Sequence, residues 1–213
     1  MKNILFAAYV LAMCANAEAA VIIGNSVTGP YQVGTNSGTK AVGFLTGSNG
    51  LLLDDIQVAL GGHDSAGGTL TFTLNSDASG LPGSFIATIG TSPTIAGFAP
   101  TAAFTITPAS PLPLAANTTY WIEVAFPASG APPAWDRTDP ANAPSSGLAT
   151  FIGYQINSGA GFTPSTTFNA IIVEGRSIAA AVPEPETYAM LLAGLGLLGF
   201  AARRRKQVGF AGV

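Results

Sequence analysis

The sequence predicts an all-β fold, an antiparallel, jelly-roll-like β-sandwich, for its central part of about 160 residues. Short segments in this part alternate apolar side chains with threonine or other polar residues, which is the two-residue period of a half-buried strand. Clusters of Gly, Pro, Ser and Asn separate these segments, and no stretch of helical period and useful length lies within residues 21–181. Residues 21–181 are therefore expected to form one domain with a substantial core.

The clearest strand is expected at residues 69–75, where Phe72 faces the core and Thr71 faces solvent. Residues 119–126 follow the same alternation, with Glu123 on the side that faces water. The other strands are expected at residues 41–45, 52–60, 84–89, 102–107, 149–156 and 168–174. Eight strands at this spacing are typical of a sandwich.

The N-terminus has the pattern of a secretory signal peptide, expected over residues 1–20. A short basic start precedes the apolar segment 4–13, and small residues then lead to the expected cleavage after Ala19 or Ala20. The mature chain would begin near Val21.

Residues 11–14, Leu-Ala-Met-Cys, offer an alternative in which Cys14 is lipidated. Met13 is too large for the position before a lipidated cysteine, so the signal-peptide interpretation is preferred. Because Cys14 is the only cysteine, its removal would leave a mature chain whose stability comes from its core without any disulfide.

The C-terminus has the pattern of a membrane anchor. Residues 187–202 are predominantly apolar and are expected to form a transmembrane helix with its N-terminal side outside and the tail 207–213 in the cytoplasm. Four cations that stop translocation follow the helix: Arg203, Arg204, Arg205 and Lys206. Sixteen helical residues span roughly 24 Å, short of the ~30 Å hydrocarbon core, so the anchor is expected to be temporary. Pro183 and Pro185 keep the preceding segment extended and accessible to a processing enzyme.

The order Pro183-Glu184-Pro185, short apolar helix and basic cluster within residues 182–206 resembles the PEP-CTERM protein-sorting signal. The resemblance implies processing by exosortase, transient attachment to the inner membrane of a Gram-negative bacterium, and delivery to the cell surface or the extracellular polysaccharide matrix. Glu186 departs from the Ser or Thr common in the family, and the tail 207–213 extends further than usual. An ordinary single-pass anchor without processing is the alternative.

The expected exported domain is acidic and sparsely charged. Residues 21–181 hold three basic against eight acidic side chains, a net charge of −5, which argues against nucleic acid as a partner. Segments 51–56, 79–83 and 113–122 resemble the choice-of-anchor R exported domains. That resemblance implies a β-rich module with no known catalytic activity and no residue-level site.

The sequence offers little support for catalysis. His63 is the only histidine, and with no elbow of the Gly-x-Ser-x-Gly type in the chain we expect it to be a solvated loop residue rather than a triad member with Asp64. One histidine and no mature cysteine cannot form a tetrahedral zinc site. Asp54 and Asp55 are adjacent, so on a regular strand they would point to opposite faces. Glu123 and Glu174 lie on expected strands and could in principle meet as a catalytic carboxylate pair, but both are expected to face outward.

Two weak ligand candidates remain. Calcium is the most reasonable ion, since carboxylates such as Asp54 and Asp64 lie near loop carbonyls, but no regular calcium-loop spacing is present and the metal stays unknown. Trp135, in the expected loop 127–147, is the candidate for an exposed sugar contact. We therefore expect a non-enzymatic exported protein without a cofactor, the alternative being a carbohydrate- or calcium-binding module of the polysaccharide matrix.

Overall fold

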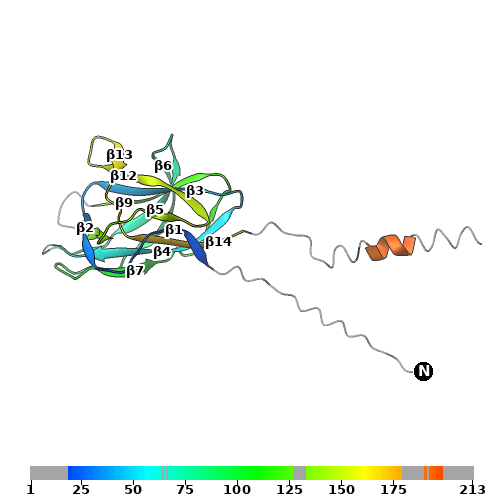
Figure 1. Ribbon diagram of the computed structural model, residues 1–213, viewed down its shortest axis with the longest axis horizontal. Helices are drawn as coiled ribbons and strands as arrows, with labels where there is room; N and C mark the ends of the chain where they lie inside the picture. Colours follow the sequence, from blue (N-terminus) through cyan, green and yellow to red (C-terminus); the bar gives the residue numbers. More distant parts are fainter. Residues whose placement is uncertain are drawn as a thin grey trace, which may run out of the picture. The chain divides into compact units, whose positions relative to one another are not determined.

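The computed structural model describes residues 19–63, 65, 67–126, 133–178, 190 and 192–198. The chain divides into two units, Met1–Ile178 and Ala179–Val213, which are considered separately. The first unit is an antiparallel β-sandwich of two packed sheets (Figure 1). This confirms the predicted all-β sandwich.

Sheet A is the larger layer. Its strands are β1 (Ala20–Gly24), β2 (Tyr31–Thr35), β4 (Leu51–Gly61), β7 (Ala102–Ile106), β8 (Leu112–Leu114), β10 (Ala134–Thr138), β11 (Ser145–Ser146) and β14 (Ile171–Ser177). The order is β11-β1-β14-β4-β10-β2, with β7 and β8 also paired to β4. Strand β4 is thus the centre of the sheet and contacts strands from both halves of the chain.

Sheet B is the second layer. Its strands are β3 (Thr39–Thr46), β5 (Thr71–Asp77), β6 (Pro82–Thr91), β9 (Thr119–Ala125), β12 (Ala149–Asn157) and β13 (Phe162–Ser165). The order is β13-β12-β3-β9-β5-β6. The centre of this sheet joins segments that are distant in sequence, since β3 pairs with both β9 and β12.

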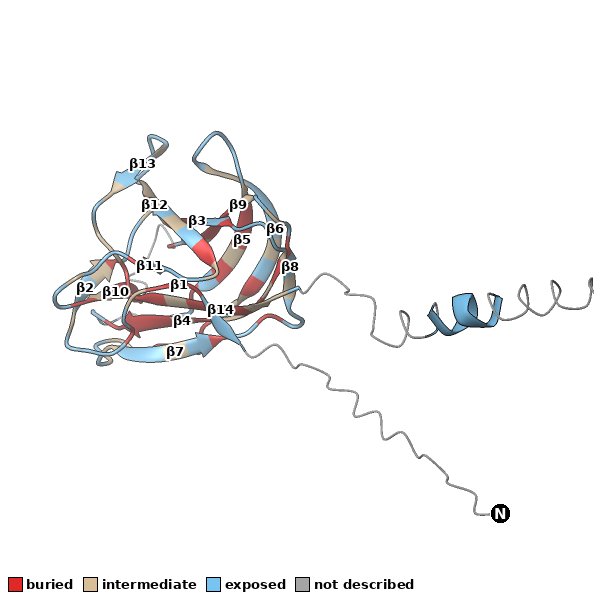
Figure 2. Cartoon of the chain, turned by 45° about the vertical axis from the view of Figure 1, so that its right-hand side comes forward, coloured by how far each residue is buried: buried red, intermediate tan, exposed pale blue. Residues whose placement is uncertain are grey.

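The core is one apolar cluster formed by strands of both sheets. Figure 2 shows that both sheets contain buried residues. Phe72 is fully buried and Thr71 is exposed, as the alternation predicts. The inner face of β4 is likewise built from fully buried aliphatic side chains such as Leu53 and Ile56. A smaller apolar cluster around Ala59 and Ala170 includes Val27, which follows β1.

All eight predicted strands have a counterpart, whereas six short strands within the described residues were missed. Strand β10 lies inside the expected loop 127–147 and carries Trp135 and Asp136, so that part of the loop prediction is wrong. Its alternation is hidden because Trp135 and Asp136 are both fully buried. A strand buried on both sides cannot be recognised from an apolar-polar period.

A β-bulge in β4 breaks the alternation at the adjacent aspartates. Glu174 pairs with Asp55 and the next residue, Gly175, pairs with Leu53, so Asp54 is the extra residue. The flanking Leu53 and Ile56 both face the core, and the two carboxylates between them lie on the outer side of sheet A. The expectation that Asp54 and Asp55 point to opposite faces is therefore wrong.

In the second unit, residues 190 and 192–198 are helical. They fall within the expected helix 187–202, whose other residues lie outside the described part. Among the residues that the structure describes, no helix is long and apolar enough to cross a membrane. The motif residues Pro183, Glu184 and Pro185 and the basic cluster 203–206 also lie outside the described residues.

Candidate functional site

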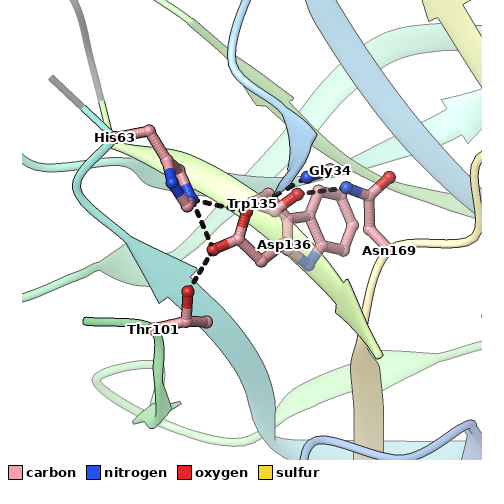
Figure 3. Close-up of polar contacts among 6 residues, drawn as sticks. All are labelled: Gly34, His63, Thr101, Trp135, Asp136 and Asn169. Atoms are coloured by element: carbon pink, nitrogen blue, oxygen red, sulfur yellow. Dashed lines mark hydrogen bonds and ion pairs between the residues drawn. The ribbon is translucent and has the colours of Figure 1, made fainter. Parts of the chain in front are cut away.

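The most developed polar site in the sandwich surrounds the carboxylate of Asp136 on β10 (Figure 3). His63 Nε2 lies 2.8 Å from Asp136 Oδ2 and 3.0 Å from Oδ1. The Thr101 hydroxyl donates to Oδ2 at 2.6 Å, and the backbone N–H of Gly34 donates to Oδ1 at 3.1 Å. A fully buried carboxylate is thus surrounded by donors from three other parts of the chain.

Glycines provide the space for this site. A Cβ on Gly61 would lie 2.5 Å from Thr101 Oγ1 and 2.6 Å from Asp136 Oδ2. A Cβ on Gly34 would lie 2.1 Å from the Trp135 carbonyl oxygen. All three distances are far below van der Waals contact, so only glycine allows the strands to approach the carboxylate this closely.

His63 lies in the loop after β4 and is exposed, as the sequence predicts. The contact of its ring nitrogen with Asp136 was not predicted. Its carboxylate partner is Asp136, 73 residues further along the chain, and not its neighbour Asp64, which lies outside the described residues.

The hydrogen bonds of this site differ from those of a Ser-His-Asp triad. In a Ser-His-Asp triad the hydroxyl contacts the imidazole, which the carboxylate orients from the other side. Here the Thr101 hydroxyl donates to Asp136, the same carboxylate that His63 contacts. Both groups therefore contact one buried carboxylate, and the arrangement connects the middle of β10 with the loop after β4 and with the residue before β7.

Trp135 is not available as a sugar platform. Its exposed fraction is 0%, and its indole N–H donates to the Ala170 carbonyl at 2.9 Å. The ring packs edge-on against Phe72, with the centroids 5.5 Å apart. The interpretation of Trp135 as an exposed loop residue is therefore wrong, because the indole fills the core.

An acidic cluster lies on the outer side of sheet A. Arg176 Nη1 pairs with Asp54 Oδ1 at 2.6 Å, whereas Asp55 stands opposite Glu174 across the β4–β14 ladder. Burial, followed by repulsion from Glu174 and Asp54, raises the pKa of Asp55 above its usual range. This like-charged pair on neighbouring strands was not recognised in the sequence, since the register of two strands 120 residues apart is set by tertiary pairing.

Glu123 lies on the other sheet and cannot act with Glu174. Its position on β9 alternates with the inward-facing Ile122 and Val124, so it lies on the outer face of sheet B. Asn75 donates to its carboxylate at 3.1 Å, and burial raises its pKa. The side chain is half-buried rather than fully solvated, and the two glutamates face opposite sides of the sandwich.

Lys40 is a buried cation that the sequence analysis did not single out. Its Nζ donates to Ser165 Oγ and, at 2.9 Å, to the Thr167 carbonyl, and it lies 5.1 Å from the centroid of the Tyr154 ring. Burial lowers its pKa to about 8. The amine attaches the connection between β13 and β14 to the core.

The carboxylates do not assemble a metal centre in the part of the chain that the structure describes. No group of three or more His, Cys, Asp or Glu residues there could hold a metal ion. Asp54, one of the carboxylates considered for calcium, instead pairs with Arg176. Another, Asp64, lies outside the described residues.

Comparison with known proteins identifies the C-terminal segment. Residues 181–206 match the PEP-CTERM protein-sorting motif, in agreement with the resemblance of Pro183-Glu184-Pro185 and the basic cluster. A comparison with curated proteins finds no match to the chain. The motif indicates an exported protein that exosortase processes and that is sorted to the cell envelope or surface.

Proposed function

We propose that this chain is a non-enzymatic surface or extracellular-matrix protein of a Gram-negative bacterium. The matched motif at residues 181–206 carries the proposal, since it marks the chain as a substrate of sorting chemistry. In this pathway the signal peptide 1–20 directs export, the segment 187–202 holds the chain briefly in the inner membrane, and exosortase then processes the region of Pro183-Glu184-Pro185.

The internal use of the polar side chains supports a non-enzymatic role. Asp136 is bound by His63, Thr101 and the Gly34 N–H, and Lys40 by Ser165 and the Thr167 carbonyl. These groups stabilise connections within the sandwich. The exported domain would therefore serve as a stable folded module at the cell surface rather than as a catalyst.

Binding of carbohydrate or calcium is the less supported alternative. Its aromatic candidate Trp135 is in the core, and Asp54 is neutralised by Arg176. Neither observation favours direct contact with the polysaccharide. Retention in the matrix would then depend on sorting rather than on a ligand site in this domain.

The mass of the cell-surface form tests the proposal. Intact mass spectrometry of material released from the host is expected to show a chain that begins near Val21 and lacks the cations Arg203, Arg204, Arg205 and Lys206. A host strain without exosortase should retain the uncleaved C-terminus in the membrane fraction. Surface material that still ends at Val213 would contradict the proposal.

A further inference from the structure

We propose that cleavage after Ala20 creates, at Val21, an α-ammonium group that pairs with Glu174 and supplies the missing counter-charge of the acidic cluster on sheet A. The inference rests on the proposed export of the chain with removal of its signal peptide. It assigns a structural consequence to processing, because the cation does not exist in the uncleaved precursor.

The strand register brings the new terminus to the cluster. Val21 of β1 pairs with Glu174 of β14, and Glu174 pairs in turn with Asp55 of β4. The three residues thus form one lateral row across adjacent strands. Directly opposed residues in an antiparallel pair have Cβ atoms about 4.5–5.5 Å apart, which places the Val21 backbone nitrogen within reach of a flexible glutamate side chain.

The row lies on one side of the sheet. Ile22 and Ile23 are both fully buried because the β1–β14 register shifts between Val21 and Ile23, whereas Val21 is 39% exposed. Glu174 lies between the buried Val173 and Gly175 and therefore faces the same outer side. The amino group and the carboxylate would meet at a partly hydrated surface.

The described residues of the cluster carry more negative than positive charge. The guanidinium of Arg176 pairs with Asp54, whereas Asp55 and Glu174 stand opposite each other in the β4–β14 ladder. Oδ2 of Asp54 and Oδ1 of Asp55 are buried without a hydrogen-bond partner among the described residues. Like charges directly opposite each other on neighbouring strands are destabilising, so an additional cation in the row would reduce the repulsion between Asp55 and Glu174.

The local structure also favours a start at Val21. Ala19 and Ala20 are exposed, whereas Ile22 begins the buried part of β1. The Val21 carbonyl accepts a hydrogen bond from the Leu148 N–H at 3.0 Å, which holds the residue in place after cleavage. A terminus at Ala20 would instead stand opposite Gly175, one residue from the Arg176 cation.

The expected signature is a raised pKa of the terminal amine. A free α-amino group titrates at about 7.7–8.0, and an adjacent carboxylate favours its charged form. A folded-state value above the unfolded one adds stability that is fully present below about pH 8 and is lost as the pH rises through the folded value. The pairing should therefore strengthen the mature protein at neutral pH.

The experiment uses the full chain, exported and processed by its own host. N-terminal sequencing of the purified product should give Val21, and reductive ¹³C-methylation followed by NMR then gives the pKa of the terminal amine. We expect this pKa to be about one unit above the ordinary value, equivalent to a tenfold shift in the protonation equilibrium. Glu174→Gln should lower this pKa most of the way back to the ordinary value. Asp55→Asn, which removes the second carboxylate of the row, should lower it by a smaller amount.

Glu123→Gln is the matched control, because Glu123 lies on the opposite face of the sandwich and its loss should leave the amine unchanged. An amine with an ordinary pKa, or one unaffected by both row variants, would overturn the inference while leaving export intact. A product that starts at another residue would also overturn it. A purified chain that retains Met1 would instead contradict the proposed function itself.

Discussion

His63 Nε2 lies 2.8 Å from Asp136 Oδ2, and this contact joins a partly exposed loop to a carboxylate in the interior of the sandwich. The Thr101 hydroxyl and the Gly34 N–H donate to the same carboxylate, and the Asp136 side chain has no access to solvent. The four residues come from segments between positions 34 and 136. These four residues meet only in the folded protein. Substitutions that remove their hydrogen bonds should therefore lower its stability.

Asp136→Asn should destabilise the protein by roughly 2–4 kcal/mol, since it replaces a charge-assisted acceptor and leaves buried donors poorly paired. Urea denaturation followed by fluorescence measures the change. His63→Gln should cost less, about 1 kcal/mol, because His63 is partly hydrated and contributes one of the contacts. Asp139→Asn, an exposed position on the same segment, should change stability by under about 0.5 kcal/mol. Equal effects at positions 136 and 139 would contradict the role given to Asp136.

Phe72→Ala should cost roughly 3–5 kcal/mol, because it opens a cavity beneath Trp135 in the centre of the core. Thr71→Ala, one residue away on the outer face of the same strand, should cost under about 1 kcal/mol. Denaturant melts of the two variants make the comparison. Similar losses would show that burial does not distinguish the two faces of β5.

Lys40 should make stability depend on pH in the alkaline range. Burial lowers its folded-state pKa from 10.5 to about 8, so between these values the unfolded chain binds more protons than the folded one. Stability should therefore rise as the pH increases from 8 towards 10, with a total effect of roughly 2–3 kcal/mol. Lys40→Met should flatten this slope in pH-dependent urea melts. A wild-type slope that survives the substitution would assign the effect to other groups.

The C-terminal segment should contain two separable functions. Neutral replacements of Arg203, Arg204, Arg205 and Lys206 should abolish stable membrane retention during export, because they remove the charges that stop translocation. Pro183→Ala with Pro185→Ala should leave the chain anchored and unprocessed with its sandwich folded. Cell fractionation and mass spectrometry distinguish these outcomes. If both variants reach the surface trimmed like the parent, the segment is not a sorting signal.

Local pattern was sufficient for the longer strands and for the sorting motif. Phe72 and Thr71 alternate on a strand with one face in the core, and this period is visible in the sequence alone. The segment containing Pro183, Glu184 and Pro185 can be recognised in the same way, because its elements follow one another within a few residues. Both features are set by residues that lie close together in the sequence.

The residues that form the sites were decided by tertiary structure. Trp135 and Asp136 occupy a strand buried on both sides, so no alternation marks them, and His63 acquires its carboxylate from 73 residues away. A single bulge places Asp54 and Asp55 on the same side of sheet A, and the pairing of β1, β14 and β4 aligns Val21, Glu174 and Asp55. Sequence alone thus determined the longer strands and the sorting motif. Register, bulges and burial, which depend on contacts between distant strands, decided which charges meet.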